Sequence, residues 1–402
     1  MRKAALPGWL YILFLTLLAT ATDEFVIAGV LPALADDLEV SVSAAGQLVT
    51  VFAVVYAVGA PTLSVICERF AKRTVLLVGL LLFVMANVAA ALAPGYWFLM
   101  GVRAAAALCA AVVASAAFAT AAAGAPEGAQ GRYLGVVTAG MTAALFSGVP
   151  LGSWLSGAFG WRVTFWLIAA VAAVAALGLL ATAPAVPGGA PAPLRERLAP
   201  LRERAVLRLV TVTFLAASGG LMFYTYLGPY TAEVAGGSYG LLSFVLFLVG
   251  AAGLVGALLS GRAVDSWGPQ RSLRRVLAGH AIALALAAGL VSSGIGNRYL
   301  LTAVIACWAA FAWALTPPVQ GSVLAAVGPV SGMTALSLNI SGLYLGTGVA
   351  AAVGGAAVGT LGVAYVPVAA AVLMTLAFLL SPAAPRAQRA ATQTPDSTSV
   401  TA

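Results

Sequence analysis

The chain has 402 residues, of which 62% are hydrophobic and only 8% are charged, and its formal net charge is +8. Soluble domains carry about 25% charged residues, so this composition excludes a soluble globular protein and predicts an all-α polytopic membrane protein. The three cysteines are scattered along the chain, which indicates neither a disulfide framework nor a metal site, and we expect no cofactor.

Twelve apolar runs follow one another along the chain, and a run of roughly 20 residues is enough to span a bilayer. They cover residues 9–34, 46–66, 75–93, 97–123, 133–159, 163–183, 206–232, 239–262, 273–293, 299–319, 333–359 and 363–380. The longest internal break, the linker 184–205, predicts an N-terminal six-helix bundle (1–183) and a C-terminal six-helix bundle (206–381). A repeated Leu-Arg-Glu-Arg in this linker indicates either a short amphipathic helix on the cytoplasmic membrane surface or a solvated connection. The polar tail, 382–402, is expected to be disordered.

The distribution of Lys and Arg predicts the orientation of the chain. If the N-terminus is cytoplasmic, all 20 of these residues lie on the cytoplasmic side except Arg103, within a span, and Arg162 and Arg298, in outer loops. Because positively charged loops stay in the cytoplasm, we expect an inner-membrane protein with both termini inside. The same distribution accounts for the net charge, so a nucleic-acid partner is not expected.

Two adjacent carboxylates, Asp23 and Glu24, lie in the first apolar run, and Arg103 lies in the fourth. Each intramembrane acid costs about 2.5–3.5 kcal/mol on the insertion scale, so it is expected to face protein or water along an ion or substrate pathway. At 1.5 Å per residue, Glu24 and Arg103 lie about 15 Å and about 10 Å below the outer ends of their spans, close enough to interact directly or through water. Burial disfavours the charged form of an acid and a nearby cation favours it, so substrate arrival or helix movement could release a proton. The alternative is a static ion pair, or an arginine that extends to the membrane surface.

An acid followed by basic residues occurs after the second apolar run and again after the eighth. The first copy contains Glu68, Arg69 and Arg73, and the second contains Asp265 and Arg271. Two such copies about half a chain apart predict two equivalent halves with a substrate site between them. These five residues are candidate gating residues that latch the cytoplasmic ends of the two halves, and the alternative is that they only set the topology.

Several segments resemble those of one transporter family. Besides the two charged loops, they are residues 22–32 (TDEFVIAGVLP), 148–152 (GVPLG), 160–162 (GWR), 224–226 (YTY) and 337–339 (SLN). Over nearly the whole chain this pattern resembles the major facilitator superfamily, and within it the twelve-span drug:proton antiporters that include chloramphenicol-resistance and arabinose-efflux permeases. The first charged loop departs from the family pattern at Ser64, Glu68 and Ala71, and Tyr344 stands where many relatives have Asn.

The resemblance implies the major facilitator fold, with two six-helix bundles and a substrate site between them. It also implies that Glu24, at the more usual acidic position, is the main proton-coupling residue and that Arg103 is the arginine of the fourth span. Asp23 points about 100° away from Glu24 on a helix, so the two acids cannot face the cavity equally, and neutralising Asp23 is expected to have the smaller effect.

Gly148, Pro150 and Gly152 match the fifth-span motif that the resembled antiporters associate with export, although simple helix packing would favour the same residues. We therefore predict proton-coupled efflux of a small amphipathic molecule, such as a drug or antibiotic, by a monomer. The alternative is export of a sugar or other polar metabolite, while uptake by symport and a non-transporting sensor are less favoured. The single histidine excludes an H-E-x-x-H metal motif, and no G-x-x-x-x-G-K-[ST] loop occurs, so neither an enzyme nor an ATP-driven pump is expected.

Polar and aromatic side chains within the spans are candidates for lining the substrate cavity. Most aromatic residues in such a chain are core or interface anchors, so this set is broader than the true lining. The candidates are Tyr56, Asn87, Tyr224, Tyr226, Trp308, Trp313, Gln320 and Asn339.

Overall fold

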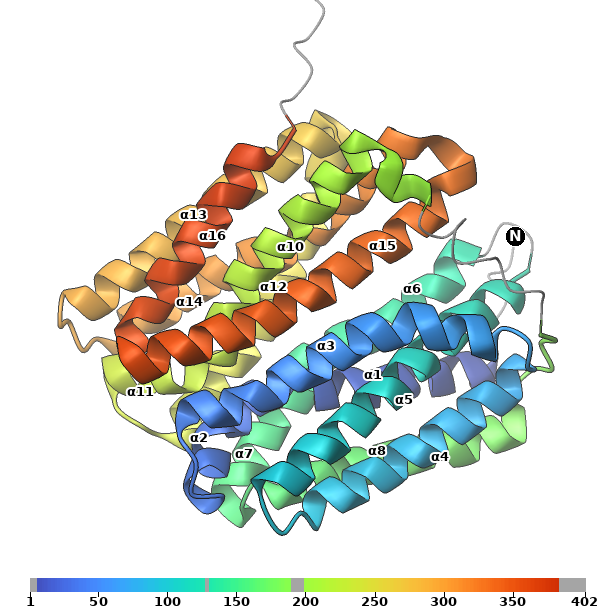
Figure 1. Cartoon of the computed structure of the whole chain (residues 1–402), viewed down its shortest axis with the longest axis horizontal. Helices are drawn as coiled ribbons and strands as arrows, with labels where there is room; N and C mark the ends of the chain where they lie inside the picture. The colour runs from blue at the N-terminus through green and yellow to red at the C-terminus, as the bar shows by residue number, and fades with distance from the viewer. Residues whose placement is uncertain (1–5, 127–129, 189–198, 383–402) are drawn as a thin grey trace, which may run out of the picture.

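The structure, a computed structural model, describes residues 6–126, 130–188 and 199–382. In this part of the chain every regular element is a helix, as expected where no water is present to satisfy backbone groups, and the long helices share one general direction (Figure 1). The predicted disordered tail and the first Leu-Arg-Glu-Arg of the linker lie outside the described residues. The second copy falls on a short 3₁₀ turn, Ala199–Arg202, and on the start of the next helix rather than on a helix of its own.

The described part of the first half contains eight α-helices and one π-helical turn. They are α1 (Gly8–Phe25), α2 (Ile27–Asp37), α3 (Val42–Cys67), α4 (Lys72–Ala91), α5 (Tyr96–Ala123), α6 (Gln130–Ala143), the π-helical turn η1 (Ala144–Gly148), α7 (Val149–Phe159) and α8 (Arg162–Thr182). The second half contains α10 (Arg204–Thr225), α11 (Leu227–Ala235), α12 (Tyr239–Trp267), α13 (Pro269–Ser292), α14 (Arg298–Trp313), α15 (Thr316–Thr360), a 3₁₀ turn η3 (Val363–Tyr365) and α16 (Val366–Leu380).

The prediction of twelve spans is confirmed. Among the described residues, 11 helices are long and apolar enough to cross a membrane, and the bent pair α1 and α2 brings the number to 12. The tenth span is longer than the sequence indicated, because the helix resumes at Thr316 and the apolar segment continues to Val327. Two prolines occupy the first turn of α15, where the missing backbone donor removes no helical hydrogen bond.

The first span is broken directly after its two acids, which the sequence analysis did not predict. α1 ends at Phe25, and α2 leaves it at an angle of 48°. The amide of Gly29 donates to the Val26 carbonyl, three residues back, so the Phe25 carbonyl loses the partner it would have in a continuous helix. The Tyr224 hydroxyl from the other half of the molecule donates to this carbonyl at 3.3 Å. The break therefore creates a backbone acceptor at the interface of the halves.

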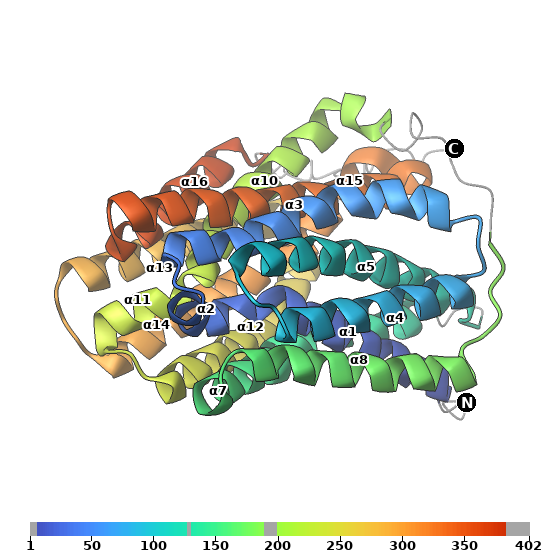
Figure 2. The same cartoon turned by 60° about the horizontal axis from the view of Figure 1, so that its bottom comes forward.

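The twelve spans form two six-helix bundles, one from α1–α8 and one from α10–α16 (Figure 1). The bundles meet along α3 and α15, which lie side by side in both views (Figures 1 and 2), and along α12, which packs against α7 and η1. At the predicted outer end, α2 contacts α11. This arrangement places the carboxylates of α1 beside the contact surface between the two bundles.

The charge distribution and the even number of spans predict that reporter enzymes fused at residues 190 and 390 are cytoplasmic and that one inserted after Asp37 is outside. Alkaline phosphatase and green fluorescent protein fusions measure this, since the first is active only outside and the second only inside. An external signal at residue 190 would contradict the division into six plus six spans.

Candidate functional site

A small cavity lies where the two bundles meet near the break in the first span. Its free volume is about 20 Å³, room for a single water molecule. The first half contributes Glu24, Phe25, Ala28, Val49, Phe52 and Ala53, and the second half contributes Leu221, Tyr224, Thr225, Tyr344 and Thr347. Because both halves form the wall, relative movement of the bundles would change its size, and an organic molecule enters only when side chains or bundles move.

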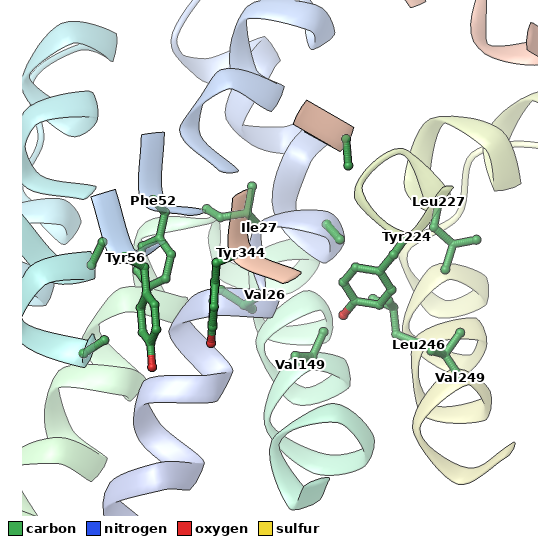
Figure 3. Packing of buried hydrophobic residues seen from close by; sticks show 14 of the residues in the cluster. Val26, Ile27, Phe52, Tyr56, Val149, Tyr224, Leu227, Leu246, Val249 and Tyr344 are labelled. Carbon is green, nitrogen blue, oxygen red and sulfur yellow. The ribbon is translucent and has the colours of Figure 1, made fainter. Parts of the chain in front are cut away.

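Glu24 is tied to the opposite half by a tyrosine. The Tyr344 hydroxyl donates to Glu24 Oε2 at 3.0 Å, and Tyr344 lies on α15 while Glu24 lies on α1. The Tyr344 ring also stacks on Tyr56 of α3, with ring centroids 3.9 Å apart and an angle of 19° between the planes (Figure 3). A hydrogen bond to an ionised carboxylate is stronger than one to a neutral group, so the charge on Glu24 affects how firmly the halves are joined.

The neighbouring acid, Asp23, has a different partner. Its Oδ1 atom lies 2.6 Å from Arg103 Nη1, and neither side chain is exposed. The Arg103 guanidinium also lies over the ring of Phe52, 4.3 Å from its centroid, and Phe52 is part of the cavity wall. The intramembrane arginine therefore forms its direct ion pair with Asp23, while Glu24 is the acid that lines the cavity.

The expectation that neutralising Asp23 affects transport less than neutralising Glu24 stays a prediction, and this pairing adds a consequence for stability. The 100° between successive residues does separate the two acids, as the sequence indicated. It turns Asp23 toward the buried cation, however, so removing the Asp23 charge would leave Arg103 uncompensated in the membrane.

Tyr224, Tyr56 and Trp313 lie at or next to the cavity. Tyr224 lines it, with its ring edge-on to Phe25 and to Trp313 at centroid distances of 5.8 Å in both cases. In Figure 3 the Tyr224 ring stands apart from the stacked rings of Tyr56 and Tyr344. Aromatic side chains thus surround the carboxylate from both halves.

The other five candidates for the cavity lie elsewhere in this conformation. Asn87 donates to the Phe83 carbonyl within α4, Tyr226 donates to the Ala351 carbonyl, and Asn339 donates to the Thr213 hydroxyl. Trp308 is buried against Phe223 in the second bundle, and Gln320 is exposed. The hydrogen bonds of Asn87, Tyr226 and Asn339 each join groups within one half of the molecule, so these three side chains serve local packing here.

Among the cavity residues that the sequence analysis did not select, Tyr344 and Phe52 are the two that contact the charged groups Glu24 and Arg103. The signal in the sequence is that Tyr344 departs from the Asn that the family resemblance implies at this position. Phe52 is one of many aromatic residues in apolar spans, and nothing in the sequence indicates that it faces Arg103.

The candidate gating residues lie at the predicted cytoplasmic ends of the helices. Arg73 donates to the Leu180 carbonyl of its own half at 2.7 Å, and the backbone of Arg69 approaches Gly188 of the linker. Glu68 follows α3, whereas Asp265 is exposed near the end of α12 and Arg271 lies in the first turns of α13. A latch between the halves through these residues stays a prediction.

The outer ends of the first bundle are joined around Asp37. Its Oδ2 atom accepts from Arg162 Nη1 at 2.6 Å and from the Trp161 indole at 3.0 Å. Arg162 also donates to the Ala93 carbonyl at 3.2 Å. These contacts connect the ends of α2, α4 and α8, and so they hold α2 where it meets α11.

The Gly-Pro motif of the fifth span lies between the first span and the opposite half. Pro150 follows the π-helical turn Ala144–Gly148, in which a wider hydrogen-bond pattern accommodates the missing proline donor. A side chain at Gly148 would collide with Thr22, the residue before Asp23. On the other side, the backbone of Phe146 approaches Gly250 of α12, where a Cβ would lie 2.5 Å from Phe146 Cα. The motif thus packs tightly against both bundles.

We expect Gly148→Ala to lower stability by about 1–3 kcal/mol, the usual effect of overpacking, and to slow transport because it displaces Thr22 and the adjacent ion pair. Gly135→Ala is the matched control, since a Cβ there would meet nothing within 4 Å. Thermal unfolding and transport rates of the two purified variants test this. Equal behaviour of both variants would show that close packing at Gly148 is dispensable.

Comparisons with known proteins agree with this architecture. The model of the Major Facilitator Superfamily matches residues 13–333. The chain is 34% identical to the uncharacterized MFS-type transporter YbcL of Bacillus subtilis, over 92% of this chain and 94% of that protein. It is 36% identical to a chloramphenicol resistance protein of Streptomyces lividans, over 65% of this chain and 67% of that protein.

A crystal structure of a D-xylose-proton symporter shares the fold. Its TM-score is 0.75 at 18% sequence identity, and the similarity covers 93% of this chain and 96% of the symporter. Identity at this level supports the arrangement of the helices and carries no information about the substrate.

Proposed function

The chain belongs to the major facilitator superfamily, and on that premise we propose that it exports a small amphipathic molecule from the cytoplasm in exchange for protons. Glu24 is the residue that binds the exchanged proton. The inner membrane is the proposed location, with the cytoplasmic side given by the positively charged loops.

The observation that carries this proposal is the position of Glu24 at the contact between the halves. Its carboxylate lines the cavity and accepts a hydrogen bond from Tyr344 of the opposite bundle. When Glu24 is ionised, this bond is charge-assisted and holds the bundles together; when Glu24 is protonated, the bond is weaker. Proton binding therefore shifts the balance between closed and open arrangements of the bundles, which is what coupling requires.

The Asp23–Arg103 ion pair adds almost no net charge next to the cavity. Because the two charges compensate each other at 2.6 Å, ionised Glu24 leaves about one net negative charge beside the cavity. A proton and a substrate compete for this charge, so arrival of substrate releases the proton.

The walls of the cavity favour an amphipathic substrate over a sugar. Phe25, Phe52, Tyr224 and Tyr344 present aromatic rings, and most of the remaining lining is aliphatic. One relative is named for chloramphenicol resistance, and removal of a drug from the cell is one route to resistance, which favours efflux over uptake.

Transport by inside-out membrane vesicles with an acidic interior tests the proposal. We expect ethidium or chloramphenicol to accumulate in vesicles that contain the protein, and a protonophore to abolish the accumulation. Accumulation of xylose alone would instead support export of a polar metabolite. Failure of all three compounds to respond to the imposed gradient, in vesicles whose protein is folded, would contradict proton-coupled export of this class of molecule.

A further inference from the structure

Tyr344 comes from the second half but is held by residues of the first. Its ring stacks on Tyr56 and its hydroxyl donates to Glu24, and only 6% of the residue is exposed. Figure 3 shows the two tyrosine rings side by side with both hydroxyls pointing the same way. The first half therefore provides a flat aromatic surface beside a carboxylate, and a phenol occupies it.

This arrangement leaves little room for a second occupant. The free volume of the cavity is about 20 Å³, enough for one water molecule. A molecule that takes a hydrogen bond to Glu24 Oε2 must displace the Tyr344 hydroxyl, and one that stacks on the same face of Tyr56 must displace the Tyr344 ring.

We propose that Tyr344 occupies the substrate subsite in this conformation, and that the transported molecule is an aromatic compound with a hydrogen-bond donor that is neutral or positively charged. This inference rests on the proposed function, because it assigns a substrate class to the same cavity. The substrate takes over the two contacts that Tyr344 makes in this conformation, a ring stacked on Tyr56 and a hydrogen-bond donor to Glu24. Aromatic stacking favours the ring, and the ionised carboxylate favours a donor or cation and disfavours an anion.

Three monovalent cations separate the required features. Ethidium has a flat aromatic system with amino donors, tetraphenylphosphonium has rings but no N–H or O–H donor, and tetrabutylammonium has neither. Their affinities for the full chain in lipid nanodiscs, measured without a pH gradient by ligand fluorescence or calorimetry, should decrease in that order.

Substitutions at position 344 test whether the tyrosine competes with the ligand. We expect Tyr344→Ala to bind ethidium about tenfold more tightly, since one hydrogen bond to a charged group and one ring no longer need to be displaced. Tyr344→Phe keeps the ring and loses only the donor, so a gain of about threefold is expected. Tyr230→Phe is the matched control, because it removes a buried tyrosine hydroxyl that donates to the Ala287 carbonyl away from the cavity, and its affinity should be unchanged.

Weaker ethidium binding by folded Tyr344→Ala and Tyr344→Phe would overturn the proposal, because Tyr344 would then be a binding partner and not a competitor. Equal affinities of the wild type for ethidium and tetrabutylammonium would overturn it as well. Failure of the proposed function is a separate result: ethidium would bind with the expected pattern, yet the pH gradient would not drive its transport.

Discussion

Glu24→Gln should abolish gradient-driven efflux while leaving downhill exchange of substrate. The amide keeps the shape of the protonated carboxyl and can still accept a hydrogen bond from Tyr344, but it cannot release a proton. Substrate exchange without net proton movement requires only that the cavity opens to both sides. Reconstituted vesicles measure both activities, with an imposed pH gradient for efflux and equal pH on both sides for exchange.

The matched control for this prediction is Glu233→Gln. Glu233 is an exposed acid on α11, so the same change of charge occurs away from the cavity, and wild-type efflux is expected. Full gradient-driven efflux by Glu24→Gln would remove Glu24 from the mechanism. Full efflux by the combined Asp23→Asn and Glu24→Gln variant would exclude this region as the proton site.

Asp23→Asn should strongly destabilise the protein. Removing one partner of a buried ion pair leaves an uncompensated charge and costs about 3–5 kcal/mol, and the Asp23–Arg103 pair is fully buried. Adding Arg103→Met should recover most of that loss, because an apolar side chain of similar length replaces the unpaired cation. Thermal unfolding of the detergent-solubilised variants measures the difference.

The exposed Asp37–Arg162 pair provides the control for this comparison. Its side chains are 45% and 39% exposed, so Asp37→Asn should cost no more than about 1 kcal/mol. The buried pair does not have the role assigned here if the Asp23→Asn variant unfolds at the wild-type temperature. The same conclusion follows if adding Arg103→Met lowers the unfolding temperature of the Asp23→Asn variant further.

The transmembrane spans and the charged residues within them were predictable from the sequence, because both depend on composition. Hydropathy identifies a span whatever it packs against, and an intramembrane acid stands out in any apolar run. The bend after Phe25 was not predictable in the same way, because the backbone carbonyl that it frees has its partner, the Tyr224 hydroxyl, about 200 residues away in the chain.

The orientation of side chains within the spans was harder to predict. A helix that is apolar all round has no polar stripe from which to read its buried face, so Asp23 could not be assigned to Arg103 from spacing alone. For the same reason Tyr224 and Tyr226 looked equivalent in the sequence. The structure places the first in the cavity wall and bonds the second to the Ala351 carbonyl.

The contact of Tyr344 with Glu24 joins residues from opposite ends of the chain. Neither helical periodicity nor local motifs connect positions so far apart, and their distance depends on how the two bundles dock. The sequence therefore singled out Glu24 as a candidate, while its hydrogen-bond partner became apparent only from the packing of α15 on α3.

The most direct test of Glu24 as the exchanged-proton site is substrate-induced proton release in weakly buffered detergent solution. Addition of ethidium to the purified protein should release protons from the wild type and none from Glu24→Gln, with both proteins still binding the dye. Release of the same number of protons by the wild type and by Glu24→Gln would contradict the account, because the proton displaced by substrate would then come from another group.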